Sequence, residues 1–292
     1  MPTFGRLLTA MVTPMNSDFS VDYERAAELA RYLVANGNDG VVVSGTTGES
    51  PTLTMAEKLK LFETVVKAVG DKAAVIGGTG SYSTAETIEL TKRAEATGIH
   101  AALLVVPYYN KPPQEGLYRH FRAIAEATSL DCILYNVPSR TVVNLAPQTT
   151  LRLAEVPNII GIKECADLNQ LTAILSGAPA GFTVWSGDDA LTLPYLALGA
   201  YGIISVAGHV VGPQIQEMIK AFVEGQNAQA AAWHRRLLPV FKGLFAVTNP
   251  VLVKAALAMT GFDAGTLRPP MVEATEKERE TLREVLASAG LL

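Results

Sequence analysis

Short apolar runs and amphipathic stretches alternate along most of this chain. Eight apolar runs have the character of buried parallel strands, and they span residues 7–13, 40–45, 73–78, 101–107, 132–138, 159–165, 182–187 and 202–208. Between them lie segments such as MAEKLKLFETVVKAVG at 55–70, whose apolar residues recur at helical spacing and which end at a glycine. This alternation predicts repeated strand–helix units.

Eight parallel strands with helices between them close naturally into a (β/α)8 barrel, and we predict this fold. A doubly wound open sheet is the alternative, because counting strands cannot prove closure. Strand patterns stop near residue 226, and residues 228–245, 249–261 and 276–290 predict three further helices. We therefore expect a barrel over residues 1–225 and an appended C-terminal three-helix extension over residues 226–292.

Composition narrows the function. The 292 residues are 49% hydrophobic with a net charge of -4, so the chain offers no positive field for nucleic acid and favours a small-molecule site. No apolar run reaches the roughly 18 residues of a membrane span, and no secretion signal is visible, so we expect a soluble cytoplasmic protein. Cys132 and Cys165 are interpreted as free thiols in strands. No group of His, Cys, Asp and Glu has metal-ligand spacing.

Lys163 interrupts the sixth apolar run, IIGIKEC. A buried ammonium loses its hydration, which costs several kcal/mol or lowers its pKa by roughly 3–5 units in extreme cases. Side chains alternate along a strand, so Glu164 points away from Lys163 and is a poor ion-pair partner. A desolvated lysine forms Schiff bases with ketones and aldehydes. The alternative is a lysine at the strand end that extends into solvent.

Further reactive side chains follow the C-terminal ends of other predicted strands, where barrels of this kind hold their active sites. Tyr135 is either a proton shuttle or an aromatic that fills the barrel. Arg140 could hold a carboxylate through two parallel hydrogen bonds, or it could be a surface arginine. Thr46 and Thr47 lie in the turn GTTGES, which either donates hydrogen bonds to an anion or is a plain strand–helix turn.

Other polar groups near the strand ends are interpreted as structural. His209 stands between glycine and valine and fits a structural histidine better than a catalytic one. Asp188 and Asp189 are predicted to cap the following helix, where a carboxylate accepts free N–H groups. The segment GGTG at 77–80 lacks the spacing of a nucleotide-binding loop and is interpreted as a turn.

The motifs GTTGES (45–50), PYYN (107–110), YNVPSRT (135–141) and NIIGIKE (158–164) together closely resemble the dihydrodipicolinate synthases, within the superfamily of pyruvate-dependent class I aldolases. The likeness extends over essentially the whole chain. It implies a (β/α)8 lyase that condenses pyruvate with L-aspartate 4-semialdehyde through a lysine Schiff base, at the entry to lysine and diaminopimelate biosynthesis. It also implies no cofactor, and a homo-oligomer that is commonly a tetramer built as a dimer of dimers.

The resemblance gives roles to the candidate catalytic residues. Lys163 resembles the Schiff-base lysine, while Tyr135, Thr46 and Tyr109 resemble a proton-relay triad. In the family this second tyrosine of PYYN crosses a dimer interface, so Tyr109 is expected to serve the neighbouring subunit's site.

The resemblance also implies substrate-binding residues. Thr47 resembles the group that binds the pyruvate carboxylate, with help from the backbone near Gly187 and Ile204. Arg140 resembles the residue that receives the carboxylate of the semialdehyde.

Many family members are inhibited by L-lysine, which binds in a cleft at the dimer interface. Sensitive members usually have histidines where Met55 and Lys58 stand and an asparagine where Tyr82 stands. We therefore expect a degenerate cleft and weak or absent inhibition. The residues that would form this cleft are Pro51, Met55, Lys58, Tyr82, Glu86 and Tyr108.

Two other functions remain open. A sibling aldolase such as N-acetylneuraminate lyase would share the barrel, the tyrosine and the lysine, but that group usually has serine at the position of Thr46 and lacks an arginine like Arg140. A barrel that binds ligands without catalysis is a more distant alternative, and the intact Lys163, Tyr135 and Arg140 argue against it.

Overall fold

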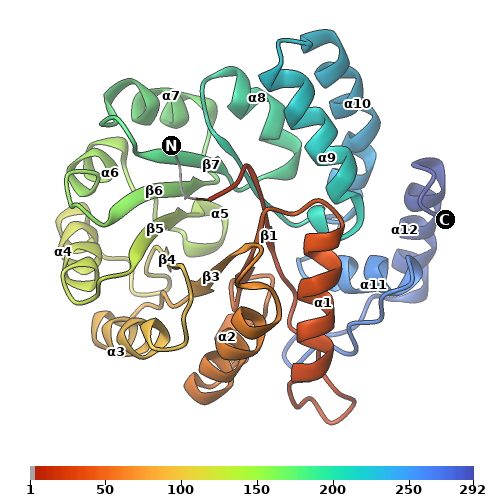
Figure 1. Cartoon of the computed structure of the whole chain (residues 1–292), viewed down its shortest axis with the longest axis horizontal. Coiled ribbons are helices and arrows are strands. Elements are labelled where there is room, and N and C mark those ends of the chain that lie inside the picture. The colour runs from red at the N-terminus through yellow and green to blue at the C-terminus, as the bar shows by residue number, and fades with distance from the viewer. Residues whose placement is uncertain (1–3) are drawn as a thin grey trace.

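The computed structural model describes residues 4–292. Eight parallel strands pair in chain order, and β8 pairs back to β1, so the sheet is a closed barrel (Figure 1). The predicted (β/α)8 barrel is confirmed, and the open-sheet alternative is wrong. The strands are β1 (Leu7–Ala10), β2 (Gly40–Val43), β3 (Ala74–Gly78), β4 (Ala101–Val105), β5 (Asp131–Asn136), β6 (Ile159–Glu164), β7 (Thr183–Ser186) and β8 (Gly202–Ser205).

Most strands end before the apolar runs that predicted them. The run at 7–13 pairs as a strand only over Leu7–Ala10, although Met11 and Val12 beyond it are fully buried. Burial continues past the end of pairing because loops and the C-terminal extension cover this rim of the barrel. An apolar run therefore indicates burial, and in most runs the last residues belong to the loops that form the rim.

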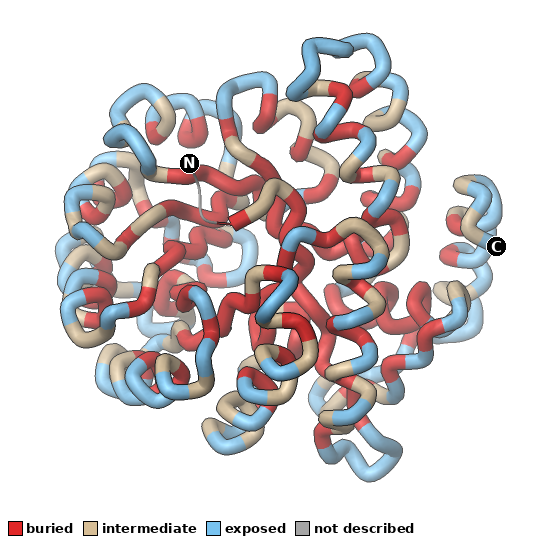
Figure 2. Tube along the Cα trace, viewed as in Figure 1, coloured by how far each residue is buried: buried red, intermediate tan, exposed pale blue. Residues whose placement is uncertain are grey.

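Helices surround the barrel, and their inner faces are buried while their outer faces are exposed (Figure 2). Several begin at a polar cap: the Thr54 hydroxyl accepts from the backbone N–H of Glu57, whose carboxylate accepts from the N–H of Thr54 in return. The helices up to the extension are α1 (Tyr23–Ala35), α2 (Met55–Val69), α3 (Thr84–Glu95), α4 (Gln114–Ala125), α5 (Pro138–Thr141), α6 (Pro147–Leu153), α7 (Leu168–Gly177), α8 (Thr192–Ala197) and α9 (Gly208–Val223), with short 3₁₀ turns η1 (Ser50–Thr52) and η2 (Asp189–Leu191).

The interior of the barrel is a packed core. Leu8, Val42, Ile76 and Ile133 meet the fully buried ring of Trp185, whose indole N–H donates to the Gly5 carbonyl at 3.1 Å. Gly5 precedes β1, so the indole closes the N-terminal end of the barrel. Open space for a ligand is left at the opposite end, where the strands deliver their C-terminal residues.

The C-terminal extension consists of α10 (Asn227–Gly243), α11 (Val251–Met259) and α12 (Glu276–Ser288), which lie together on one side of the barrel (Figure 1). It does more than add an outer layer. The Lys254 ammonium on α11 contacts the Glu49 carboxylate at 2.8 Å, and both side chains are buried. The Arg268 guanidinium contacts Glu57 at the start of α2 at 2.7 Å. The extension thus holds the loop after β2. Within residues 4–292, none of the helices is long and apolar enough to span a bilayer.

Candidate active site

A cavity of about 510 Å³ opens at the C-terminal ends of the strands. It gathers residues from the ends of β5 and β6 and from the loops after β2, β5, β6, β7 and β8, together with residues from α10 and from the loop before α11. The sequence-predicted residues that line it are Thr46, Thr47, Tyr135, Arg140, Lys163 and Gly187.

Lys163 is only 5% exposed, although it lines the cavity. Its Nζ lies 4.5 Å from the centroid of the Tyr135 ring, because Lys163 and Tyr135 are register partners on β6 and β5. No carboxylate in the described part of the chain lies within ion-pair distance of this amine. Burial lowers the pKa of Lys163, which shifts the amine toward its neutral, nucleophilic form.

Tyr135 keeps its proton in this environment. Burial raises the pKa of the phenol well above its usual value, and a hydrogen bond with the Thr46 side chain opposes this shift only in part. A neutral phenol beside a hydroxyl can donate a proton and recover it through the same contact. Tyr135 and Thr46 are therefore suited to move protons next to the amine of Lys163.

Glu164 faces away from Lys163, as the alternation along the strand predicted. Its carboxyl is fully buried on the outer face of β6. It accepts hydrogen bonds from Asn136 Nδ2 at 2.9 Å, Gln170 Nε2 at 2.9 Å and the backbone N–H of Ala166 at 2.7 Å. Burial raises the pKa of Glu164. The carboxyl therefore fixes the segments around β5 and β6 without pairing with the lysine.

Gly187 and Cys165 are packed against each other at the cavity wall. A Cβ at Gly187 would lie 2.1 Å from Cys165 Sγ and 2.9 Å from Lys163 Cε, so only glycine fits beside the lysine. Both cysteines are free thiols, as predicted. Cys132 lies in β5, but Cys165 lies one residue beyond β6, so its predicted place within a strand is wrong. Burial raises the pKa of Cys165 to about 12, which keeps it a neutral thiol.

Thr47 and Arg140 meet at a residue that sequence reasoning missed. Asn249, just before α11, donates from Nδ2 to Thr47 Oγ1 at 2.8 Å, and its backbone carbonyl accepts from Arg140 Nη2 at 3.3 Å. An asparagine before a proline predicts only a break between helices, and nothing in its sequence surroundings points to a barrel loop about 200 residues earlier.

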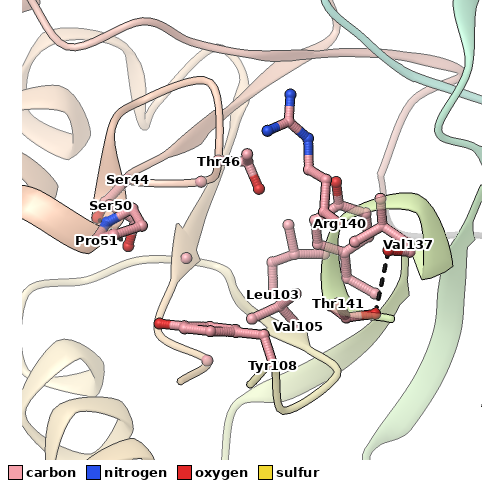
Figure 3. A pocket seen from close by; sticks show the side chains of 14 residues that line it. Ser44, Thr46, Ser50, Pro51, Leu103, Val105, Tyr108, Val137, Arg140 and Thr141 are labelled. Carbon is pink, nitrogen blue, oxygen red and sulfur yellow. Dashed lines mark hydrogen bonds between the residues drawn. The ribbon is translucent and has the colours of Figure 1, made fainter. Parts of the chain in front are cut away.

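A second cavity of about 210 Å³ shares Thr46, Tyr135 and Arg140 with the first. Figure 3 shows Thr46 and Arg140 at one end and Tyr108 at the other, with Ser50 and Pro51 at the side. Tyr109 does not line either cavity.

The two remaining predicted residues lie apart from the cavities. Tyr109 is 93% exposed and has a left-handed backbone with φ of 72°. Ile204 is buried in the core of the barrel, so only its backbone could approach a ligand.

The residues of the predicted lysine cleft gather beside the smaller cavity. The rings of Tyr82 and Tyr108 meet edge to face at 5.3 Å. Burial lowers the pKa of the Lys58 ammonium, and the charge of Glu86 opposes that shift. Met55 Sδ accepts from Arg93 at 3.1 Å.

The structural interpretation holds for His209, and the predicted cap is confirmed for Asp188 but is wrong for Asp189. His209 is buried, and its Nε2 accepts from the backbone N–H of Val12. Asp188 caps η2 by accepting from the N–H of Ala190 at 2.8 Å. Asp189 instead accepts from the Ser205 hydroxyl and from the N–H groups of Val206 and Ala207 at 3.0 and 3.1 Å, so it joins η2 to the end of β8. Its burial excludes it from the exposed cap position.

A buried lysine with no ionic partner among residues 4–292, set beside a buried tyrosine at the C-terminal rim of a (β/α)8 barrel, defines an enzyme of the Schiff-base-forming class. Comparison with known proteins is more specific. Residues 3–289 match the dihydrodipicolinate synthetase family, and the chain belongs to this family.

Relatives and solved structures agree over the full length. The chain is 71% identical over 293 residues to the 4-hydroxy-tetrahydrodipicolinate synthase of Symbiobacterium thermophilum, with 100% of both chains covered. It is similar to the crystal structure of dihydrodipicolinate synthase from Bacillus anthracis, with a TM-score of 0.97, 48% identity and 99% of both chains covered. It is also similar to the lysine-bound structure of the enzyme from Cyanidioschyzon merolae, with a TM-score of 0.98, 46% identity and 100% of both chains covered.

Proposed function

We propose that this protein catalyses the 4-hydroxy-tetrahydrodipicolinate synthase reaction, in which pyruvate condenses with L-aspartate 4-semialdehyde through a Schiff base on Lys163. The observation that carries this proposal is the amine of Lys163, which is buried, has no ionic partner in the described part of the chain, and lies 4.5 Å from the centre of the Tyr135 ring. Relatives of 71% and 58% identity that carry this enzyme name support it.

The reaction begins when the neutral amine of Lys163 attacks the ketone carbon of pyruvate. Water leaves and an imine remains. The lowered pKa of Lys163 matters at this step, because an ammonium has no lone pair to donate. Thr47 and the backbone at Gly187 hold the pyruvate carboxylate at the cavity wall, where both residues lie.

The imine then becomes the electron sink for carbon–carbon bond formation. It loses a methyl proton to give an enamine, and the enamine carbon attacks the aldehyde of the second substrate. Tyr135 and Thr46 relay the protons that these steps move, and Tyr109 of a neighbouring subunit completes the relay. The substrate's own amine finally displaces Lys163 by transimination, which closes the ring and restores the free lysine.

Arg140 receives the carboxylate of the semialdehyde. It lines both cavities, and its guanidinium is held by the carbonyl of Asn249 at 3.3 Å, which leaves other N–H groups free to donate to an anion. A homotetramer built from dimers, in the cytoplasm, completes the proposal. The high exposure of Tyr109 supports a subunit interface at this position.

Trapping with borohydride tests the proposal directly. We expect pyruvate with borohydride to modify Lys163 covalently, because reduction turns the imine into a stable amine, and peptide mapping locates the adduct. Lys163→Ala should abolish trapping. Lys242→Ala is the matched control, because Lys242 also lines the cavity but is exposed and should not react. An adduct on another lysine would overturn the assignment. Direct product analysis with aspartate semialdehyde and with N-acetylneuraminate separates the synthase from its sibling lyase.

A further inference from the structure

Asn249 brings the C-terminal extension into the active site. It is 5% exposed, lines the larger cavity and lies two residues before the start of α11. It touches both residues proposed to hold substrate carboxylates, and it does so with different atoms. Its side chain contacts Thr47, whereas its backbone carbonyl contacts Arg140. The two contacts can therefore be separated by mutation.

The side-chain contact sets the direction of a hydrogen bond. Asn249 Nδ2 donates to Thr47 Oγ1 at 2.8 Å, so an acceptor site of this hydroxyl is already occupied. The hydrogen of the Thr47 hydroxyl then remains available for another acceptor. An ionised carboxylate only accepts hydrogen bonds, so a hydroxyl held in this way is prepared to bind it.

The amide of Asn249 is not placed for stability alone. Its Oδ1 is buried and has no hydrogen-bond partner among the described residues. A buried acceptor without a partner destabilises the folded state, and such groups call for a functional reason. The hydrogen bond from Nδ2 to Thr47 sets the amide in this orientation, in which Oδ1 has no partner among the described residues.

The loop that carries Thr47 is fixed against the same extension. Glu49, two residues later, contacts Lys254 at 2.8 Å and accepts from the backbone N–H of Arg268 at 2.8 Å. The Thr13 hydroxyl donates to the Gly48 carbonyl at 2.6 Å on the other side. These contacts keep Thr47 and Asn249 at a constant separation, so the hydrogen bond between them exists before substrate binds.

We propose that Asn249 is a positioning residue for both substrates: its side chain makes the Thr47 hydroxyl a donor to the pyruvate carboxylate, and its carbonyl orients the Arg140 guanidinium. This inference rests on the proposed function and adds a residue outside the barrel to the site. It predicts that loss of the side chain affects pyruvate and spares the second substrate, because the carbonyl of residue 249 remains in any variant.

The experiment measures borohydride trapping as a function of pyruvate concentration, together with steady-state kinetics for both substrates. For Asn249→Ala we expect the half-saturating pyruvate concentration to rise about tenfold, as expected for the loss of one oriented hydrogen bond to an anion. The KM for the semialdehyde should change less than about twofold. Asn249→Asp should raise the pyruvate requirement further, because a carboxylate accepts from Thr47 and repels the substrate.

A double-mutant cycle with Thr47→Val distinguishes positioning from general support of the fold. If Asn249 acts through the Thr47 hydroxyl, Asn249→Ala should add little in the Thr47→Val background. Asn169→Asp is the control, since the Asn169 side chain is exposed on α7 and its replacement should leave pyruvate trapping unchanged. Thermal unfolding of each variant shows whether the fold is retained, and Asn249→Asp, which keeps the side-chain size, decides the case if the alanine variant does not fold.

The outcomes separate this inference from the proposed function. Failure of the native protein to trap pyruvate at Lys163 would refute the function itself. Normal trapping in the native protein with an unchanged pyruvate requirement in the Asn249 variants would overturn the role of Asn249. If the Asn249 variants lose affinity for both substrates equally, and the loss adds to that of Thr47→Val, Asn249 has a general structural role. This result would also overturn the proposed role of Asn249.

Discussion

Tyr109 should act in the active site of a neighbouring subunit. Within its own subunit the side chain is 93% exposed and lines neither cavity. Its backbone is left-handed, with φ of 72°, in the loop between β4 and α4. We expect the Tyr109→Phe and Lys163→Ala variants to be inactive alone and to restore activity when their subunits mix. In a hybrid dimer both substitutions affect one site, and the other site keeps its native Tyr109 and Lys163.

The size of the recovery follows from counting sites. Random mixing of equal amounts places about half of the dimers in the hybrid class, and each hybrid has one intact site, so activity should reach about a quarter of the native value. The residual activity of the Tyr109→Phe parent is low, since loss of a proton-relay group lowers the rate by about 10²–10⁴-fold. The expected signal is therefore far above that of either parent.

The assay needs two tags, one on each variant, so that hybrids are purified and their formation is proven. A mixture of Tyr135→Phe with Lys163→Ala is the matched control, because both groups line the same subunit's cavity and no hybrid can hold an intact site. Hybrids of the Tyr109 pair that form but remain as inactive as their parents would refute action in trans.

Three further predictions follow from other contacts. Arg140→Ala should still trap pyruvate but lose roughly 10–100-fold in kcat/KM for aspartate semialdehyde, with exposed Arg122→Ala as the control; an unchanged kcat/KM would refute the role. L-Lysine should inhibit weakly or not at all, because the Lys58 cation repels it and Met55 and Tyr82 replace polar partners; strong inhibition well below millimolar in a titration of initial rate would contradict this. Glu57→Gln should destabilise the fold by about 1–2 kcal/mol, because hydrogen bonding to Arg268 lowers the pKa of Glu57 from 4.5 to about 2. This value is reduced for solvent screening of the pair. Denaturant unfolding should show the difference in stability above pH 4.5, and the difference should disappear as the pH falls toward 2.

The sequence was sufficient to predict the barrel because its signal is local and repeated. Each buried strand is a continuous apolar run, and each helix has its own spacing and cap, as at Thr54. The ends of the strands were less predictable. Met11 and Val12 are as buried as the strand before them but do not pair as part of it, and hydrophobicity alone does not distinguish the two situations.

The same limit applies to the site. Lys163 could be identified because a cation in an apolar strand is a local anomaly, and Tyr135 because it lies near the C-terminal end of the preceding strand. Asn249 and Lys254 could not be found in this way, since each contacts the loop after β2 from about 200 residues further along the chain. Asp189 shows the opposite error. Its neighbours suggest a helix cap, yet the closure of the barrel brings it to the N–H groups after β8.

The reactivity of Lys163 depends on the geometry of β6 itself. Lys163 and Glu164 are adjacent in sequence, and their charges would attract if the side chains met. Alternation along the strand keeps them on opposite sides of the sheet, and each is buried without an ionic partner among the described residues. Burial accordingly lowers the pKa of Lys163 and raises that of Glu164, so both shift toward their neutral forms. A direct ion pair would instead stabilise the ammonium and remove the lone pair that attacks a ketone. The strand therefore separates the lysine from the carboxylate next to it in sequence, and this separation favours the nucleophilic form that a Schiff-base enzyme requires.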